Sequence, residues 1–587
     1  MTDYWIHPGL LLIIGSVLTP FLSEAIKKPF LLSLTAMAFA SSTLLPIGEY
    51  GCLDFLGFTI TFMRVDKLSL LFSYVFTIAG FIGMIYAYHV KDDLQHIAAL
   101  VYMGSALGVI FAGDFIGLFI FWEAMAFASV CLVWANRTTS SLRAGYRYIL
   151  VHIFGGILLL AGIMIQISQT GSIAFDSMMA YSGSLAFYLV MFGFMLNAAV
   201  PPIHAWLPDA YPSATVTGAV FMSAYTTKSA VYVLIRGYPG EELLLVLGAI
   251  MAVYGVVYAA MENNGRRLLA YHIVSQVGFM VCGIGIGNET AINGASAHAF
   301  AHIIYKGLLF MGAGAVLYMA GTAKLTELGG LYKKMPLTMI FFIIGGLSIA
   351  GSPLMSGFIS KSMTISGAGE AKNSFAFLML TLASSGTFLS IVLKMTYYMF
   401  FGRDSGLNVS EPPKNMLIAM AIASSLCIIL GCAPQFLYAF LPYPVNYHPY
   451  TVHHVISALG LFLFTTLGFI IFIKKMAPKD VINLDTDWVY RRGAKIFMSL
   501  VNNQVARFEY KFVGEIYEFI IQKPMLKVAR FIAKFDENIL DRGFNSIGET
   551  ILSVSHISRS LQNGRIHSYS FSIAIGLLIS ILLIIWL

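Results

Sequence analysis

Charge is the scarcest property of this sequence. Of its 587 residues only 11% are Asp, Glu, Lys or Arg, whereas 58% are hydrophobic. Soluble domains carry about 25% charged residues, so the composition excludes an ordinary soluble protein and predicts a polytopic membrane protein. The formal net charge is +7, but the basic residues are scattered and form no run that could follow a phosphate backbone. This distribution argues against nucleic-acid binding.

Cysteine is also scarce, and the five cysteines show no CxxC or zinc-finger spacing. The sequence lacks GxSxG and HExxH motifs, and it lacks a nucleotide-binding glycine loop in the required context. Residues 1–8 lack the basic start of a signal peptide, which favours a retained first span. We therefore expect no catalytic site of its own, no cofactor and no metal. An integral membrane enzyme is the weaker alternative.

Long apolar runs make up most of the chain, and a run of roughly 20 residues can span a bilayer. Sixteen such runs lie near 9–22, 29–46, 68–88, 97–113, 115–134, 146–168, 184–205, 217–235, 244–261, 267–287, 292–319, 337–364, 375–401, 415–432, 453–473 and 568–587. Lys and Arg concentrate in alternate connections, whereas the connections between them hold only Arg64, Lys67, Arg236 and Lys372. Because such residues favour the cytoplasmic side, we predict an all-α protein of the cell inner (plasma) membrane with both termini outside.

The stretch from Asp485 to about Ser560 does not read as a span. Apolar residues such as Val505, Phe508 and Phe512 recur at three- and four-residue steps, with charged residues between them. This pattern predicts an amphipathic helix with a kink at Pro524. It would lie along the membrane surface over residues 477–565 and be tied down by the last span. A small cytoplasmic domain is the alternative.

Two apolar runs contain helix-breaking residues at their centres. Pro201 and Pro202 interrupt the seventh run, and Pro353 with its neighbouring glycines interrupts the twelfth. Broken helices five spans apart predict two inverted five-helix repeats, an arrangement that places ion sites at the midplane of transporters. The predicted parts are helices 1–3 (1–95), a first repeat (96–240), a second repeat (241–405), two further helices (406–476), the lateral helix (477–565) and an anchor (566–587).

Several ionisable residues stand inside these runs, where a charge is costly and a functional role is the default hypothesis. They are Glu123, Lys228, His298, His302, Lys306, Lys361 and Lys394. His298, His302 and Lys306 share one helix face, which favours a hydrated proton path. Each could instead belong to a structural ion pair, the two histidines could bind a metal, and Lys394 could extend its ammonium to the membrane surface.

Six segments carry a family resemblance over roughly residues 60–405. They are FWEAMAF around Glu123, PPIHAWLPDAYP (201–212), TTKSAVY around Lys228, RRLLAYHIVSQVG (266–278), HAFAHIIYKGLLF (298–310) and SGFISK (356–361). The chain resembles the antiporter-like membrane subunits of respiratory complex I, Mrp-type cation/proton antiporters and membrane-bound hydrogenases. The resemblance implies proton-pathway roles for Glu123, Lys228, the His298–Lys306 face and Lys361. It also implies other membrane subunits as partners, H⁺ and possible Na⁺ transport, and a place in an Mrp-type, NADH:quinone oxidoreductase-like or hydrogenase complex.

The chain departs from the family pattern at Asn197, where a lysine paired with the fifth-span glutamate is usual. Asparagine cannot titrate but can hold a hydrogen bond. We therefore expect Glu123 to couple to Lys228 directly or through one water, with Asn197 as the bridge. The alternative function is a non-conducting structural subunit that braces a complex through its lateral helix.

Overall fold

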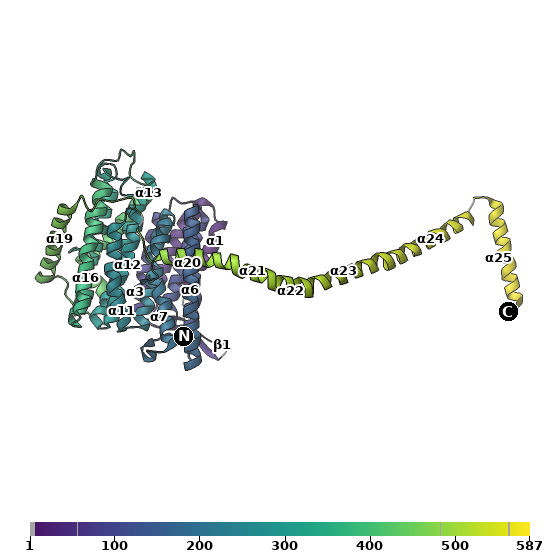
Figure 1. The fold of residues 1–587 in the computed structure, drawn as a ribbon, viewed down its shortest axis with the longest axis horizontal. Coiled ribbons are helices and arrows are strands. Elements are labelled where there is room, and N and C mark those ends of the chain that lie inside the picture. Colours follow the sequence, from purple (N-terminus) through teal and green to yellow (C-terminus); the bar gives the residue numbers. More distant parts are fainter. Residues whose placement is uncertain (1–5, 56, 482, 562–563, 587) are drawn as a thin grey trace. The chain divides into compact units, whose positions relative to one another are not determined.

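The computed structural model describes residues 6–55, 57–481, 483–561 and 564–586. The chain forms two compact units, the first ending at Asp487 and the second beginning at Trp488. The first unit is a bundle of helices (Figure 1). Its larger helices are α1 (Pro8–Leu18), α2 (Glu24–Leu44), α3 (Lys67–Tyr86), α4 (Asp93–Phe111), α5 (Phe115–Trp134), α6 (Thr139–Thr170), α7 (Leu185–Asn197), α8 (Trp206–Ser213), α9 (Val216–Ala224), α10 (Thr226–Gly237), α11 (Glu242–Met261), α12 (Gly265–Ile286), α13 (Glu289–Ala320), α14 (Pro336–Ala350), α15 (Ser356–Glu370), α16 (Ser374–Thr387), α17 (Lys414–Cys432) and α19 (Val452–Phe472).

Shorter elements connect these helices. They include three 3-10 turns, η1 (Thr19–Phe21), η2 (Met178–Tyr181) and η3 (Leu331–Lys333), and the short helix α18 (Gln435–Tyr438). After α16 the chain continues as two π-helical segments, η4 (Phe388–Met395) and η5 (Tyr397–Phe401). Strands β1 (Gly48–Phe55) and β2 (Phe58–Val65) pair antiparallel as a hairpin that hydropathy runs did not predict.

Side-chain caps fix where several helices begin. Asp66 accepts from the backbone N–H of Ser69 at the start of α3, and Asp114 accepts from Gly117 at the start of α5. These carboxylates satisfy backbone donors that have no partner within the helix. At the other end, α6 stops at Gly171, which adopts the left-handed conformation with φ 67° that glycine tolerates best.

Helix α13 lies at the centre of the first unit. It packs against α3, α9, α12, α14, α15 and α17, and its residues from Ala291 to Val316 are buried. Tyr86 of α3 donates to the Met311 carbonyl of α13 across this core, at 2.8 Å. The central helix therefore carries His298, His302 and Lys306 into the interior.

Each of the sixteen predicted apolar runs overlaps helix in the described ranges, although the runs 184–205 and 337–364 also contain non-helical residues. Among the residues that the structure describes, eleven helices are long and apolar enough to cross a membrane, and three shorter apolar helices occur at Pro8–Phe21, Leu185–Asn197 and Pro336–Ala350. The fold is thus that of a helical multi-pass membrane protein, while the count of sixteen spans and the inverted repeats stay predictions. One detail was wrong. The run 217–235 is two helices, α9 and α10, that meet at Tyr225.

The second unit is helical in its described residues, apart from residues 564 and 565 before the last helix. Helical segments follow one another from Asp487 to Leu561, as the extended rod labelled α20 to α24 in Figure 1. They are α20 (Asp487–Leu500), η6 (Val501–Val505), α21 (Ala506–Phe508), η7 (Glu509–Gly514), α22 (Glu515–Tyr517), η8 (Glu518–Gln522), α23 (Lys523–Phe535), η9 (Asp536–Asp541) and α24 (Arg542–Leu561), and α25 (Ile566–Trp586) follows. A π-helical segment precedes Pro524, so the helix continues through it. The helix begins at Asp487, two residues after the predicted start of the amphipathic stretch at Asp485 and within the predicted part 477–565.

Candidate functional site

The seventh predicted span is interrupted across its two prolines. Helix α7 ends at Asn197 and α8 begins at Trp206. Ala199 between them has φ 57°, a left-handed conformation that is uncommon for a residue with a side chain. The indole N–H of Trp206 donates to the Leu196 carbonyl at 3.1 Å, which satisfies one of the backbone groups that the break leaves open.

The twelfth predicted span is interrupted in a similar way around Pro353. Helix α14 ends at Ala350 and α15 begins at Ser356, with Gly351 at φ 80° and Leu354 at φ 69°. The first turn of α15 lies so close to α14 that a Cβ at Gly357 would stand 1.8 Å from the Ser348 carbonyl oxygen. Only glycine fits there without movement of the backbone.

Three buried lysines donate to the carbonyl ends of helices. Lys228 donates to Ser223 at the end of α9 (2.6 Å), and Lys361 donates to Ile349 at the end of α14 (2.7 Å). Lys394 donates to Ala260 and Glu262 at the end of α11, at 2.5 and 3.0 Å. The carbonyl end of a helix carries partial negative charge, so each ammonium has an electrostatic reason to rest there. Because Lys394 is 1% exposed, protein and not solvent binds its ammonium.

The polar face of α13 lies among these lysines. His298 Nδ1 is 3.0 Å from the Ser360 hydroxyl of α15, and its Nε2 is 3.3 Å from the Tyr305 hydroxyl. Both ring nitrogens of His302 and the ammonium of Lys306 are buried without a hydrogen-bond partner among the described residues. Helix α13 packs against α10, which carries Lys228, and against α15, which carries Lys361. The face therefore lies between these two lysines, and we call the set the polar line.

His298 and His302 lie among hydroxyl and aromatic groups of the core. In the ranges that the structure describes, no group of three His, Cys, Asp or Glu residues could hold a metal ion. His298 instead uses its ring nitrogens to contact hydroxyl groups. The arrangement is suited to passing protons between hydroxyl and imidazole groups.

Glu123 and Asn197 do not make the contacts expected from the sequence. Glu123 Oε1 and both polar side-chain atoms of Asn197 are buried without a hydrogen-bond partner in the described part of the chain. Lys228 donates to a helix end instead, and Glu123 lies against Gly156 of α6. The direct form of the expected Glu123–Asn197–Lys228 bridge is therefore wrong, because Asn197 makes no side-chain hydrogen bond in the described residues and Lys228 donates to Ser223. A water-mediated form stays a prediction.

The sequence did not predict two further polar contacts, which His272 and Gln276 make. His272 Nε2 is 2.7 Å from the Ser390 hydroxyl of η4, and Gln276 donates to the Thr387 hydroxyl at 3.3 Å. Both residues stand within the segment 266–278 that carries the family resemblance, which was the available signal. They extend the polar line from α13 toward α16 and η4.

The segment that follows α19 is fastened to the broken seventh span. The Asp485 carboxylate accepts from His204 (3.2 Å), from Tyr271 (2.6 Å) and from Tyr254, and the Tyr258 hydroxyl donates to the Leu484 carbonyl. Burial alone would raise the pKa of Asp485, but the hydrogen bonds from His204, Tyr254 and Tyr271 bring this pKa well below its usual range. No sequence pattern joins positions 204 and 485, so only the structure could identify this cluster.

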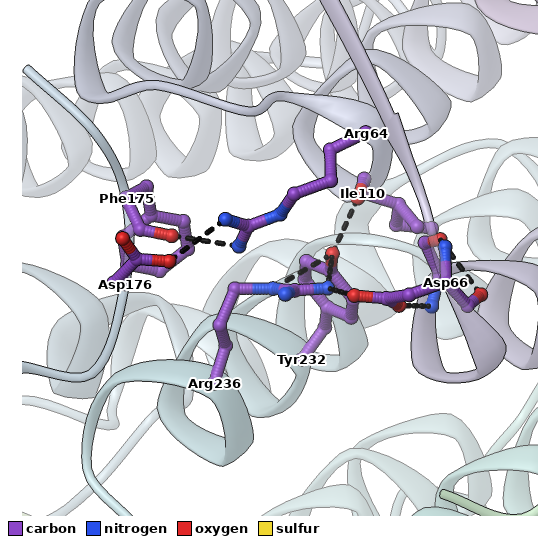
Figure 2. Close-up of polar contacts among 8 residues, drawn as sticks. Arg64, Asp66, Ile110, Phe175, Asp176, Tyr232 and Arg236 are labelled. Atoms are coloured by element: carbon purple, nitrogen blue, oxygen red, sulfur yellow. Dashed lines mark hydrogen bonds and ion pairs between the residues drawn. The ribbon is translucent and has the colours of Figure 1, made fainter. Parts of the chain in front are cut away.

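Ion pairs close the end of α10 that lies beyond Lys228 (Figure 2). Arg236 contacts the Asp66 carboxylate at 2.7 Å and donates to the Tyr232 hydroxyl, which in turn donates to the Ile110 carbonyl. Beside it, Arg64 pairs with Asp176 at 2.9 Å and donates to the Phe175 carbonyl. The side chains drawn in Figure 2 thus tie β2, α3, α4, α10 and the loop before η2 together.

Comparison with known proteins places the chain among ion-transporting membrane subunits. Residues 112–387 match the family model described as "NADH:quinone oxidoreductase/Mrp antiporter, TM". The chain is 31% identical over 349 residues to one Na(+)/H(+) antiporter subunit of Alkalihalophilus pseudofirmus, covering 56% of this chain and 70% of that protein. It is 31% identical over 424 residues to another Na(+)/H(+) antiporter subunit of the same organism, covering 64% of this chain but about half (52%) of that protein.

The fold comparison extends over nearly the whole chain. A chain of the archaeal membrane-bound sulfane sulfur reductase complex aligns with a TM-score of 0.68 at 24% identity, covering 98% of this chain and 99% of that chain. This likeness concerns the fold, while the match over 349 residues to the bacterial antiporter protein carries the family assignment. The chain belongs to the family of antiporter-like membrane subunits found in NADH:quinone oxidoreductases and Mrp antiporters.

Proposed function

We propose that this antiporter-like subunit translocates protons within a multisubunit membrane complex, through the buried line formed by Lys228, the α13 face and Lys361. The observation that carries the proposal is the set of buried basic groups on α13 without a partner in the described residues, His302 and Lys306. Burying a polar group without a hydrogen bond is costly, and burying an unpaired charge costs far more. Such groups are retained in membrane proteins where an ion pathway needs them.

The lysine contacts suggest how a proton could be held and released. A protonated lysine is stabilised at a helix end by the carbonyl groups that it contacts, whereas a neutral amine gains less from the same position. Loss of a proton would therefore free the side chain of Lys228 or Lys361 to move toward its neighbour on the line. Lys394, beside Glu262 at the end of α11, is proposed as the inner entry to this line.

The complex to which the protein belongs decides what drives transport. The relatives' names concern Na⁺/H⁺ antiport, and the archaeal neighbour is a respiratory complex. We propose protons as the transported ion in either setting, with Na⁺ as the counter-ion if the complex is of the Mrp type. The expected location is the plasma membrane with both termini outside.

Transport by the intact complex in proteoliposomes tests the proposal. Proton uptake is driven by an imposed sodium gradient or by the electron donor of the complex, and is followed with a pH-sensitive dye. Lys306→Met and Lys361→Ala should each lower the rate by about tenfold or more, since a proton relay loses a titrating group. Lys414→Met, at an exposed position at the start of α17, should transport at the normal rate. Normal transport by both pathway variants would contradict the proposal.

The second candidate is a structural protein of the complex that does not conduct. Asn197 in place of a titratable residue and the closed end of α10 in Figure 2 both favour it for the first repeat. The buried basic groups of α13, α15 and η4 have no evident purpose under this alternative. Assembly of the complex with unchanged transport in the Lys306→Met variant would favour the structural role.

A further inference from the structure

Helix α23 of the second unit carries four basic residues and no acidic residue among its thirteen positions. The helical segments before and after it have the opposite balance. Residues 509–522 contain three glutamates and one lysine, and residues 536–541 contain three acidic residues and no basic one. Positive charge is therefore concentrated in α23, between two acidic segments of the long helix (Figure 1).

The basic residues of α23 share one face of the helix. They recur at steps of four, three and four positions, which is the spacing of neighbours along a helix surface. We call this set the basic stripe, and it consists of Lys523, Lys527, Arg530 and Lys534. All four side chains are exposed within the second unit, so the stripe is open to a ligand or partner.

The opposite face of α23 is apolar. At 3.6 residues per turn, a residue two positions away lies on the other side of a helix, and the large apolar residues have this offset from the basic stripe. They are Met525, Val528, Ile532 and Phe535, with exposed fractions of 45–67%. A helix with a basic face and an exposed apolar face is typical of segments that lie in a membrane surface.

Most of the basic stripe has no acidic partner. Lys523 lies 3.5 Å from Glu518 of η8, whereas Lys527, Arg530 and Lys534 form no ion pair with the residues that the structure describes. Like charges three or four residues apart destabilise a helix. The stripe is therefore expected to bind an anionic surface that neutralises it.

The composition of the stripe favours lipid headgroups over an acidic protein surface. Three of its four members are lysines, whose ammonium is a single charge on a flexible stem, whereas the planar fork of arginine matches a fixed carboxylate best. Flexible ammonium groups suit mobile phosphate groups. The connection before the second unit also holds Lys474, Lys475 and Lys479, which predicts the cytoplasmic side, where the leaflet has a negative surface potential.

We propose that α23 is a binding site for anionic phospholipid, in which the basic stripe binds phosphate headgroups of the inner leaflet and the opposite face enters the boundary with the acyl chains. The proposal goes beyond proton translocation and does not depend on it. Each basic residue near an anionic membrane surface strengthens binding by about fivefold. The stripe should therefore give α23 a preference for anionic over neutral lipid that the acidic segments beside it lack.

Hydrogen exchange of the full chain, purified with the subunits that accompany it, tests this preference. The complex is placed in nanodiscs of phosphatidylcholine alone, or of phosphatidylcholine with added phosphatidylglycerol. The amides of residues 523–535 should exchange at least about ten times more slowly in the anionic nanodiscs, because bound headgroups relieve the repulsion within the stripe. The difference should largely disappear in about 1 M salt, where charges are screened beyond about 3 Å.

Two double variants separate the stripe from the charge of the whole helix. Lys527→Gln combined with Arg530→Gln should abolish most of the lipid-dependent slowing. Arg507→Gln combined with Lys511→Gln also removes one arginine and one lysine, but from a part of the helix that contains three glutamates, and should retain it. Glutamine forms helices about as well as lysine and arginine. Lys527→Arg combined with Arg530→Lys keeps the charge and should behave as the unchanged chain.

Equal exchange in the two kinds of nanodisc would overturn the proposal. Slow exchange in both would mean that a partner subunit covers α23, and fast exchange in both would mean that nothing binds there. Lipid-dependent slowing that persists in the Lys527→Gln and Arg530→Gln variant, or that the Arg507→Gln and Lys511→Gln variant loses equally, would also contradict it. These outcomes are independent of proton uptake, which the Lys306→Met and Lys361→Ala variants test.

Discussion

Three helices of the first unit, α9, α14 and α11, have a buried lysine at their carbonyl end. Ser223, Ile349 and Ala260 supply these carbonyls to Lys228, Lys361 and Lys394. A helix that ends inside the membrane leaves backbone carbonyl groups without partners within the helix. It creates the partial negative charge that can hold a buried ammonium. A change that alters the break should therefore affect the lysine as well, even without touching it.

Gly357 offers a test of this connection between break and lysine. A Gly357→Ala variant places a methyl group against the Ser348 carbonyl, so α14 and α15 must separate. Overpacking of this kind costs about 1–3 kcal/mol, and Lys361 should lose its place at Ile349. We expect a lower melting temperature of the purified complex and reduced proton uptake.

Gly460→Ala is the matched control for that variant. Gly460 stands within α19, and nothing lies within 4 Å of a Cβ at this position. The control should melt and transport as the unchanged protein does. If Gly357→Ala also behaves normally, the fit between α14 and α15 is looser than the proposed role of the break requires.

At the residue scale, sequence reasoning identified the buried basic residues but not their partners. Lys228, Lys306 and Lys361 stand out because charge inside an apolar run is rare. The break at Tyr225 had no such signal. No proline or glycine marks it, and the freed backbone N–H of Thr226 donates to the Tyr102 hydroxyl from α4. A partner 124 positions away cannot be read from local pattern.

The residues between α19 and α20 make contacts that the sequence did not predict. They fall partly within the predicted part 477–565, but residues 477–481 and 483–486 lie outside any helix and form a strap that contacts α11 and α12. Asp480 pairs with Lys324, and Asp485 accepts hydrogen bonds from His204, Tyr254 and Tyr271. These long-range contacts satisfy the buried carboxylate of Asp485.

Asp485→Ala should release the strap. A hydrogen bond to a charged group contributes about 1.5–3 kcal/mol, so loss of the bonds from His204, Tyr254 and Tyr271 should favour local opening by about tenfold or more. Trypsin cleavage after Lys474, Lys475 or Lys479 should accelerate accordingly. Because the pKa of Asp485 is lowered, its carboxylate stabilises the strap above the ordinary aspartate pKa of about 4, and this contribution is lost only on acidification below that value.

Asp480→Ala is the comparison for that experiment. Its pair with Lys324 is exposed to solvent, where ion pairs contribute little, so cleavage should remain close to the normal rate. Equal acceleration in the two variants would mean that Asp485 does not hold the strap.

The β-hairpin shows a different limit of prediction at the scale of elements. Strand β2 alternates polar and apolar residues in the order Phe58, Thr59, Ile60, Thr61, Phe62, which is a strand pattern. It is too short to register among runs of roughly 20 residues. Its value lies in Arg64 at its end, which pairs with Asp176 near the closed end of α10 (Figure 2).

At the scale of the whole molecule, the chain divides into a bundle with a buried core and a helix without one. In the second unit, residues such as Phe508, Phe512 and Phe519 are 60–72% exposed. These residues recur on one face of the helix, as the sequence predicted. An apolar surface of this length needs lipid or other subunits to cover it. We therefore expect the second unit to contact the membrane or partner subunits along this face.

Truncation after Asp487 separates the two units and tests this division. The remaining chain keeps the Asp485 cluster and every contact within the first unit, so it should insert into the membrane and retain its own thermal stability. Partner subunits that rest on the amphipathic helix should be lost. The measurement is the set of proteins that co-purify in mild detergent. It is compared with the set that co-purifies with a chain lacking only residues 566–587.

If the truncated chain retains every partner, the helix does not brace the complex. If the shorter deletion loses the same partners, the final helix α25 is what holds them, and the long helix acts only as its connection. Retention of partners by the shorter deletion and their loss from the longer one would place the bracing role in the amphipathic face itself.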